Sequence, residues 1–302
     1  MRFDGIRFDP RLAPLIDETR AFYARRSPGR GPRGADELRS MRAAAPVPAP
    51  SDPPARCELA ESGGRSVPVR VQLPRAGSPA GVLLDLHGGG FYLGSAADHD
   101  VRNQDLADAL GIAVVGVDYR LAPEDPWPAA PEDCEAAARW LVAGAARRFG
   151  TTRLAICGFS AGATLATTTL VRLRDRGIDA FGCAVLQFGT YDLSGRTPSG
   201  RLIADEYFIE AYAGHVPDRA HPDVSPIYAD LSGLPPVRLV VGAEDVLLGD
   251  NRAMAARLAA AGVDVDLRVY PAAPHGFTAH PTPMADAARA DVRQWLAGHL
   301  GA

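Results

Sequence analysis

Short apolar runs alternate with longer amphipathic segments from Gly81 to the end of the chain. Runs that are apolar throughout are typical of strands buried on both faces, whereas the segments between them have the spacing of helices. This alternation predicts the α/β class, with a mostly parallel central sheet flanked by helices. The apolar runs expected as strands are 82–86, 112–117, 154–157, 184–188 and 237–241. Apolar and polar residues alternate over 265–270, which is expected to be the last strand. The expected helices are 131–148, 161–174, 251–261 and 285–300.

The first 55 residues have a different pattern. Apolar residues recur at helical spacing over 12–25, and a second, shorter helix is expected over 35–44. The proline-rich run 46–54 cannot continue a helix, so we expect an extended connection there. Residues 1–55 are therefore predicted to form N-terminal cap helices and a linker.

Two further segments complete the predicted organisation. Residues 57–61 and 67–73 flank a Ser-Gly-Gly-Arg turn, which is a good hairpin signal. A helix expected over 202–212 falls between two strands and, with the N-terminal helices, would cover the sheet edge where open α/β proteins bind ligands. We therefore expect one α/β domain over 56–302, with a cap insertion at about 195–222.

The composition narrows the possible functions. The 302 residues are 47% hydrophobic and 23% charged, which is ordinary for a globular protein and excludes extensive disorder. A net charge of −4 gives no general attraction to nucleic acid or to an anionic membrane, so neither is an expected partner. All 32 basic residues are arginine, which excludes Schiff-base chemistry, a Walker lysine and a Ser–Lys dyad.

Cysteine usage and the hydropathy pattern favour a cytoplasmic protein. The four cysteines lie far apart, so neither a disulfide framework nor a zinc ribbon is expected, and Cys157 and Cys183 fall in buried apolar runs. No apolar run is long enough to span a membrane, and the first ten residues do not resemble a signal peptide. Residues 98–100, Asp-His-Asp, could be imagined as metal ligands, but no partner cluster accompanies them, so a solvated helix start is expected.

The strongest local signal is the sequence Gly-Phe-Ser-Ala-Gly at 158–162, which follows one expected strand and opens an expected helix. This context is the one that a G-x-S-x-G nucleophile turn requires. A serine at a sharp strand-to-helix turn takes a strained backbone conformation that exposes its hydroxyl, and the helix N-terminus favours developing negative charge. Ser160 is therefore the predicted nucleophile.

A serine hydroxyl needs a base, and the base needs an orienting carboxylate. In α/β-hydrolases the chain order is Ser, then Asp or Glu, then His. His275 follows the last expected strand through a short loop, and it alone among seven histidines lies both late enough and directly beyond a strand. Asp245 sits in the loop after strand 237–241; its neighbour Glu244 is interpreted as a structural carboxylate, and Asp250 as the N-cap of the next helix.

Three consecutive glycines provide a candidate oxyanion hole. His87-Gly88-Gly89-Gly90 follows strand 82–86, and glycines can present backbone N–H groups to a developing oxyanion without side chains in the way. Two amides of Gly88, Gly89 and Gly90, together with the amide of Ala161, are the expected donors. A phosphate-binding loop is the alternative, but neither a following lysine nor a G-x-G-x-x-G spacing is present.

These motifs resemble those of the bacterial hormone-sensitive-lipase-like carboxylesterases. The resemblance covers about residues 56–300 and implies an α/β-hydrolase fold, a helical cap and hydrolysis of esters with short to medium acyl chains. One position departs from it, because Phe159 stands where that family usually has an acidic residue. The matching segments are His-Gly-Gly-Gly-Phe at 87–91, Asp-Tyr-Arg-Leu-Ala-Pro-Glu at 118–124, Gly-Phe-Ser-Ala-Gly at 158–162, and the regions 242–247, 270–271 and 275–277.

The resulting expectation is two-step acyl transfer by Ser160, His275 and Asp245, with no cofactor and no metal. The partner is a small-molecule ester, and a homodimer is a candidate assembly that no sequence feature decides. Amide hydrolysis or deacetylation of a small metabolite would use the same triad, and a non-catalytic receptor on this scaffold would usually have lost a triad residue. Candidate aromatic walls of an apolar substrate pocket are Phe91, Tyr92, Phe159, Phe188, Tyr191, Phe208 and Tyr212.

Overall fold

An eight-stranded sheet forms the centre of the computed structural model, which describes residues 2–3, 6–26 and 29–301. The strand order is β10-β9-β8-β7-β5-β6-β4-β3, and all neighbours are parallel except the two pairs that involve β4. The strands are β3 (Arg56–Ser62), β4 (Arg65–Gln72), β5 (Val82–Leu86), β6 (Ala113–Val117), β7 (Leu154–Phe159), β8 (Phe181–Gln187), β9 (Val237–Gly242) and β10 (Val265–Tyr270), besides a two-stranded ribbon of β1 (Arg2–Phe3) and β2 (Ile6–Arg7).

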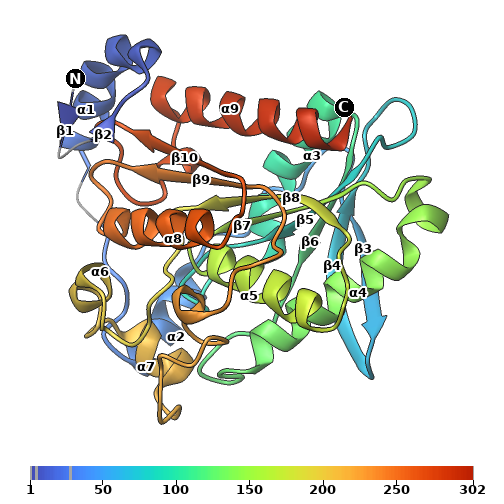
Figure 1. Ribbon diagram of the computed structural model, residues 1–302, viewed down its shortest axis with the longest axis horizontal. Helices are drawn as coiled ribbons and strands as arrows, with labels where there is room; N and C mark the ends of the chain where they lie inside the picture. The colour runs from blue at the N-terminus through green and yellow to red at the C-terminus, as the bar shows by residue number, and fades with distance from the viewer. Residues whose placement is uncertain (1, 4–5, 27–28, 302) are drawn as a thin grey trace.

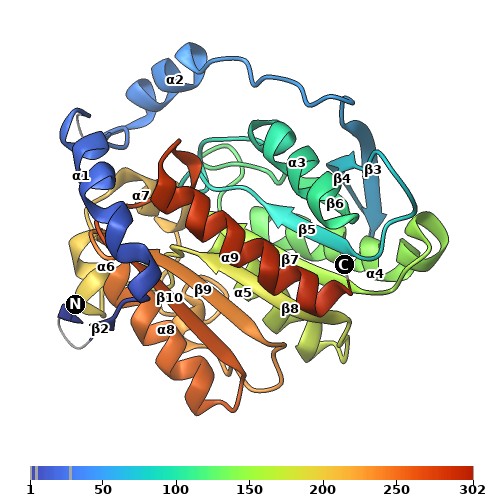
Figure 2. The ribbon, with the colours of Figure 1, turned by 90° about the horizontal axis from the view of Figure 1, so that it is seen from above.

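Helices cover both faces of this sheet, as Figures 1 and 2 show. Four short 3₁₀ turns supplement them at Pro10–Leu15, Ala96–His99, Pro226–Tyr228 and Phe277–Ala279. The helices are α1 (Ile16–Ala24), α2 (Ala35–Ala44), α3 (Asp100–Leu110), α4 (Ala129–Phe149), α5 (Ala161–Asp175), α6 (Pro198–Leu202), α7 (Tyr207–Ala213), α8 (Leu248–Ala260) and α9 (Pro283–Leu300).

Alternate residues of each central strand enter two separate hydrophobic cores. Leu84 and Ile156 pack on the side of α4, α5 and α8, whereas Leu83 and Cys157 pack on the side of α3 and α9. Because successive side chains of a strand point to opposite faces, a run that is apolar throughout can fill both cores. The predicted α/β architecture with a mostly parallel sheet is therefore confirmed.

Three expected helices differ from the observed ones. The helix expected over 12–25 begins as a 3₁₀ turn that contains Pro14, and α1 starts only at Ile16. The helix expected over 202–212 is interrupted at 203–206, so that α6 and α7 are separate. The interpretation of Asp250 as a helix N-cap is wrong, because α8 begins at Leu248 and Asp250 lies inside its first turn.

Helix α3 has no counterpart among the helices expected from apolar spacing. The residues that it buries are mainly polar, namely Asp100, Asn103 and Gln104, with Ala107. Asp100 is paired with Arg70 of β4 and accepts a hydrogen bond from Gln72 at 2.8 Å, so this residue is not the solvated helix start that we expected. A helix that packs through paired polar groups leaves no apolar stripe for a sequence to display.

Within the described residues, no helix combines the length and the apolar character that crossing a lipid bilayer would require.

Replacing a central core residue tests the two-sided packing. Ile156→Ala empties a fully buried position in β7 and should lower the free energy of unfolding by about 2–5 kcal/mol. Leu202→Ala, at a position whose side chain is 69% exposed, should change it by less than about 0.5 kcal/mol. Urea titration of both variants is the measurement, and similar losses in the two would contradict the assignment of Ile156 to the core.

Candidate active site

Four loops meet at the carboxyl edge of the sheet, where parallel strands β5, β7, β9 and β10 end. The loop after β5 carries the three glycines, the turn after β7 carries Ser160, and the loops after β9 and β10 carry Asp245 and His275. The parallel order brings side chains more than a hundred positions apart in the chain to one edge.

The turn at Ser160 is sharp and strained. Its backbone has φ 52° and ψ −117°, a region that side chains other than glycine rarely occupy, and its N–H donates to the carbonyl of Gln187 at 2.9 Å. A Cβ atom at Gly158 would overlap the backbone of Gly162, and one at Gly162 would overlap the carbonyl of Leu86. Only glycine at both positions lets the turn pack this closely against the end of β5.

Ser160, His275 and Asp245 form a continuous hydrogen-bonded chain. The Oγ of Ser160 lies 3.0 Å from Nε2 of His275, whose Nδ1 lies 3.0 and 3.1 Å from the two carboxylate oxygens of Asp245. The Asp245 side chain is fully buried, whereas the His275 ring is 38% exposed. A buried carboxylate on Nδ1 fixes the tautomer in which Nε2 can accept the serine proton.

The other two carboxylates near this loop have different positions. Glu244 is exposed, and the carboxylate hydrogen-bonded to His275 is that of Asp245. Asp250 is fully buried and accepts hydrogen bonds from the backbone N–H groups of Tyr191 and Asp192. Asp250 therefore holds the loop after β8, a role that its position in the sequence did not reveal.

The glycine loop contacts the turn that carries the serine. Gly88 packs against the turn, so that a Cβ there would lie 3.0 Å from the carbonyl oxygen of Phe159. Gly89 and Gly90 have φ values of 116° and 60°, which favour glycine. In the part of the chain that the structure describes, the N–H groups of Gly89, Gly90 and Ala161 donate to no protein acceptor, so they are free to bind an oxyanion.

The buried side chain of His87 packs against the glycine loop and stabilises it. Its Nδ1 lies 2.7 Å from the carbonyl oxygen of Gly88, and the hydroxyl of Tyr119 donates to the His87 carbonyl at 2.7 Å. The two rings stack with centroids 4.1 Å apart. Burial lowers the pKa of the His87 imidazole to about 4, so the ring is neutral at physiological pH.

The N-terminal segment is tied to the same loop by Arg42 of α2. Its guanidinium donates two hydrogen bonds to the Tyr92 carbonyl, at 2.8 and 2.9 Å, and one to the Ala122 carbonyl at 2.6 Å. It also forms an ion pair with Glu124 at 2.8 Å. Arg120, in the same matching segment as Glu124, pairs with Asp133 of α4.

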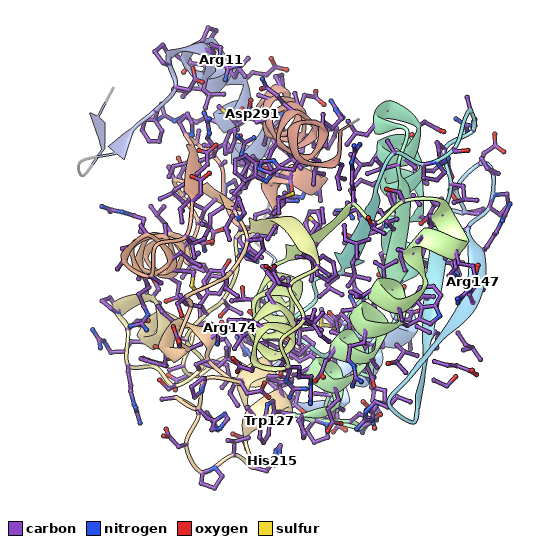
Figure 3. The ribbon with its side chains drawn as sticks, turned by 45° about the vertical axis from the view of Figure 1, so that its right-hand side comes forward. Arg11, Trp127, Arg147, Arg174, His215 and Asp291 are labelled. Atoms are coloured by element: carbon purple, nitrogen blue, oxygen red, sulfur yellow. The ribbon has the colours of Figure 1, made fainter. Side chains whose placement is uncertain are left out.

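Two more contacts hold the flanking helical segments to the body of the protein. Figure 3 shows Arg11 beside Asp291 of α9, at 3.5 Å, and Trp127 beside His215, with ring centroids 6.3 Å apart. The Trp127 indole also donates to Asp223 at 2.9 Å. Arg11 thus attaches the segment before β3 to α9, and Trp127 attaches the segment after β8 to the loop that precedes α4.

The seven candidate pocket aromatics separate into four groups. Phe91, Tyr191 and Tyr212 are almost fully buried, and Phe91 stacks on Tyr212 at 3.9 Å, so all three are packing residues. Phe188 meets the His275 ring edge-on at 5.1 Å. Only Tyr92 and Phe208 approach the glycine loop from the cap side, because a Cβ at Gly90 would lie 3.2 Å from Phe208. The last candidate, Phe159, projects to the opposite side, under the Arg102 guanidinium at 4.0 Å.

A buried ionic cluster lies on that opposite side and was not anticipated. Asp85 of β5, 1% exposed, accepts from Arg102 at 2.7 Å and lies 2.8 Å from Nδ1 of His99. Burial alone would raise the pKa of this carboxyl, but the facing Arg102 and His99 outweigh it and hold the pKa below its ordinary value. One feature of the sequence could have indicated this cluster: Asp85 is the single polar residue of an otherwise apolar strand, so a buried partner for its charge was to be expected.

The Asp-His-Asp sequence at 98–100 does not gather around one point. Asp98 accepts from the Ser95 backbone at 2.7 Å, His99 faces Asp85, and Asp100 faces Arg70. Among residues 2–3, 6–26 and 29–301, no group of three or more His, Cys, Asp or Glu side chains is arranged to hold a metal ion.

The depressed pKa of His87 predicts an acid-sensitive fold. Between its ordinary value of 6.5 and about 4, the unfolded chain binds a proton that the folded protein does not, so stability falls as pH falls through this window. The full shift corresponds to roughly 3 kcal/mol. Urea unfolding between about pH 7 and 4.5 should show a smaller loss for His87→Asn than for the parent protein, and equal losses would contradict this role of His87.

Known proteins resemble this chain in both sequence and structure. Residues 83–279 match a family described by its α/β-hydrolase fold. An ethyl acetate hydrolase of Pseudomonas putida is 36% identical over 72% of this chain and 74% of its own length, and a carboxylesterase of Mycobacterium tuberculosis is 36% identical over 71% and 72%. A solved esterase from the bacterial hormone-sensitive lipase family superposes with a TM-score of 0.74 at 32% identity, covering 98% of this chain and 100% of that one. The chain therefore belongs to the α/β-hydrolase fold family, within its bacterial hormone-sensitive-lipase-like group, as the motifs predicted.

Proposed function

We propose that this protein is a serine carboxylesterase in which Ser160, His275 and Asp245 are the catalytic residues. The observation that carries the proposal is the hydrogen-bonded chain from Asp245 through His275 to Ser160 beside unpaired amides. An exposed imidazole nitrogen 3.0 Å from a strained serine hydroxyl is the arrangement that nucleophilic acyl transfer requires. The names of the relatives, all hydrolases of esters or acetyl groups, support the same reaction.

The reaction would proceed in two steps. Ser160 Oγ attacks the ester carbonyl carbon while Nε2 of His275 takes its proton, and Asp245 stabilises the imidazolium. The resulting oxyanion accepts hydrogen bonds from two amides of Gly88–Gly90 and from that of Ala161. The tetrahedral intermediate then expels the alcohol, which takes the proton from Nε2, and leaves an acyl ester on Ser160. Water attacks this ester with the same base, releasing the carboxylic acid and restoring the serine hydroxyl.

Residues 1–55 and about 195–222 are proposed to form the cap over this site. Arg42 links the first segment to the loop after β5, and Phe208 of α7 links the second to Gly90. Phe208 and Tyr92 both lie close to Gly90, and these apolar rings beside the glycine loop support a substrate with a short to medium acyl chain. A relative from Streptomyces hygroscopicus named acetyl-hydrolase, 39% identical over 63% of this chain, agrees with the short end of this range.

Two accompanying expectations concern location and assembly. We propose a cytoplasmic location, supported by the absence of disulfides among Cys57, Cys134, Cys157 and Cys183, all of which are described and free. The homodimer stays a prediction.

Ester hydrolysis across acyl length tests the proposal. Rates on p-nitrophenyl esters should be highest for short acyl chains, and Ser160→Ala should lose at least ~10³-fold, because the nucleophile and its base act as a unit. Matched ester and amide substrates measured side by side distinguish a carboxylesterase from an amidase. Turnover by the serine variant comparable with the parent protein would refute the assignment.

A second test concerns the identity of the acid. Asp245→Asn should lower kcat by about 10³–10⁴-fold, because the amide no longer holds His275 in the proton-accepting tautomer. Glu244→Gln, one position away and exposed, is the matched control and should retain nearly full activity. A large loss in the glutamate variant with little change in the aspartate variant would reverse the assignment.

A further inference from the structure

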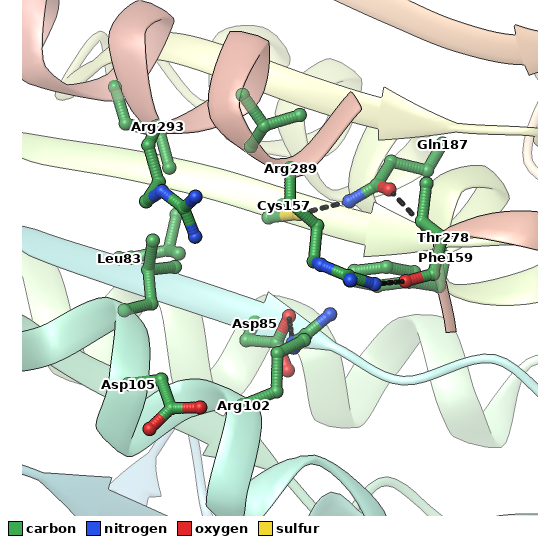
Figure 4. Close-up of a pocket in the computed structure, with 13 residues that line it drawn as sticks. Leu83, Asp85, Arg102, Asp105, Cys157, Phe159, Gln187, Thr278, Arg289 and Arg293 are labelled. Carbon is green, nitrogen blue, oxygen red and sulfur yellow. Dashed lines mark hydrogen bonds and ion pairs between the residues drawn. The ribbon is translucent and has the colours of Figure 1, made fainter. Parts of the chain in front are cut away.

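A cavity of about 130 Å³ lies between α3, α9 and the sheet. It is lined by residues of β5, β7, β8, α3 and α9, and by Thr278. Neither Ser160 nor His275 lines it, and Figure 4 shows it on the face of the sheet that α3 and α9 cover. An apolar cavity of about 150 Å³ can bind a molecule the size of benzene, so this volume suits a ligand of similar size.

The cavity has an apolar floor and a charged rim. Carbon and sulfur atoms of five side chains form the floor: Leu83, Leu106, Cys157, Val292 and Leu296. Three arginines, Arg102, Arg289 and Arg293, line the same cavity, and Figure 4 shows them at its upper and lower sides. Such a combination suits an amphipathic ligand whose apolar part is buried and whose polar end meets the guanidinium groups.

The charges of the rim favour a single negative charge on that end. Arg102 is paired with the buried Asp85, and Arg289 donates to the Thr278 carbonyl at 2.5 Å and pairs with Asp286. In the described part of the chain Arg293 forms no ion pair, and the other lining carboxylate, Asp105, is exposed to solvent that screens it. Among the described residues, Arg293 is therefore the lining arginine without a carboxylate partner.

The wall of the cavity is shared with the residues that hold the catalytic groups. Phe159 lines the cavity and immediately precedes Ser160. Gln187 lines it too, while its backbone carbonyl accepts the Ser160 N–H at 2.9 Å. The Thr278 hydroxyl donates to the Gln187 side chain at 3.1 Å, and Thr278 is three residues after His275. A ligand in the cavity would therefore contact the supports of both Ser160 and His275.

We propose that this cavity is a second ligand site, separate from the cleft at Ser160, that binds a monocarboxylate with a short apolar chain or ring. The carboxylate meets Arg293, whose planar guanidinium matches a carboxylate in two parallel hydrogen bonds, and the apolar body fills the floor between Leu106 and Leu296. The same chemical class includes the acid released by the proposed reaction, so this part of the inference rests on the proposed function. Binding itself does not depend on it.

Hexanoate is a suitable probe, with hexanamide as its uncharged counterpart. Ligand-observed NMR titration is first carried out on protein whose Ser160 has been blocked with a fluorophosphonate, and mass spectrometry verifies the label. Hexanoate should still bind, and hexanamide should bind at least ~10-fold more weakly, because it lacks the charge that Arg293 recognises. Failure of the label to attach would count against the proposed function alone, because the variants described below test hexanoate binding in the cavity on unlabelled protein.

Two variants and one control locate the binding. Leu106→Trp, at a partly exposed position, fills the floor and should abolish hexanoate binding; Arg293→Gln should weaken it at least ~10-fold. Arg147→Gln, an exposed arginine of α4 that Figure 3 shows at a distant surface, should leave it unchanged. Circular dichroism and activity on a short-chain ester verify that each variant is folded.

Three results would overturn the proposal. Loss of hexanoate binding on labelling Ser160 would assign it to the catalytic cleft. Binding that survives labelling but is unaffected by Leu106→Trp would place it elsewhere on the molecule. Equal binding of hexanoate and hexanamide, unaffected by Arg293→Gln, would mean that the cavity binds apolar groups but does not recognise a carboxylate.

Discussion

The site depends on a close approach between two strand ends. Gly158 and Gly162 leave no side chain between the turn after β7 and the carbonyl of Leu86 at the end of β5. That contact fixes Ser160 in a backbone conformation that an isolated peptide would avoid, and it brings the glycine loop against the same turn. The positions of nucleophile and amide donors therefore follow from one steric constraint, and the base and acid are added by loops from neighbouring strands.

Strain of this kind is concentrated around the site. Within the described residues, positive φ values occur at four non-glycine positions: Phe91, Ser160, Phe188 and Ala272. Each follows a strand that ends at the active edge, and buried polar groups hold this edge in place. Asn251, for example, exchanges two hydrogen bonds with the backbone of Gly189, at 2.9 and 3.2 Å. Such buried pairs offset a conformational cost that local sequence alone could not sustain.

The sequence was informative where function and fold depend on local pattern. Apolar runs predicted the central strands, with β5 at its observed bounds, and alternation predicted the edge strand β10. The motif spacing predicted which loops would carry Ser160, Asp245 and His275. It failed where long-range polar contacts decide the structure. Helix α3 buries amides and carboxylates rather than an apolar stripe, and Asp250 looked like a helix cap because its partners, the amides of 191 and 192, are distant in the chain. Likewise, no periodicity could show that Phe159 faces away from the cleft.

The attachment of α2 has a consequence for how the protein would lose activity on heating. Leu38 is the one buried side chain of this helix, so little apolar area opposes its release, and the three backbone hydrogen bonds of Arg42 carry much of the attachment. Detachment of α2 would require far less free energy than unfolding of the sheet. It would nevertheless release the loop after β5, which presents the amides of the glycine loop. Thermal inactivation should thus run ahead of the spectroscopic transition, and enzymatic assays would report a local event that global probes of folding do not detect.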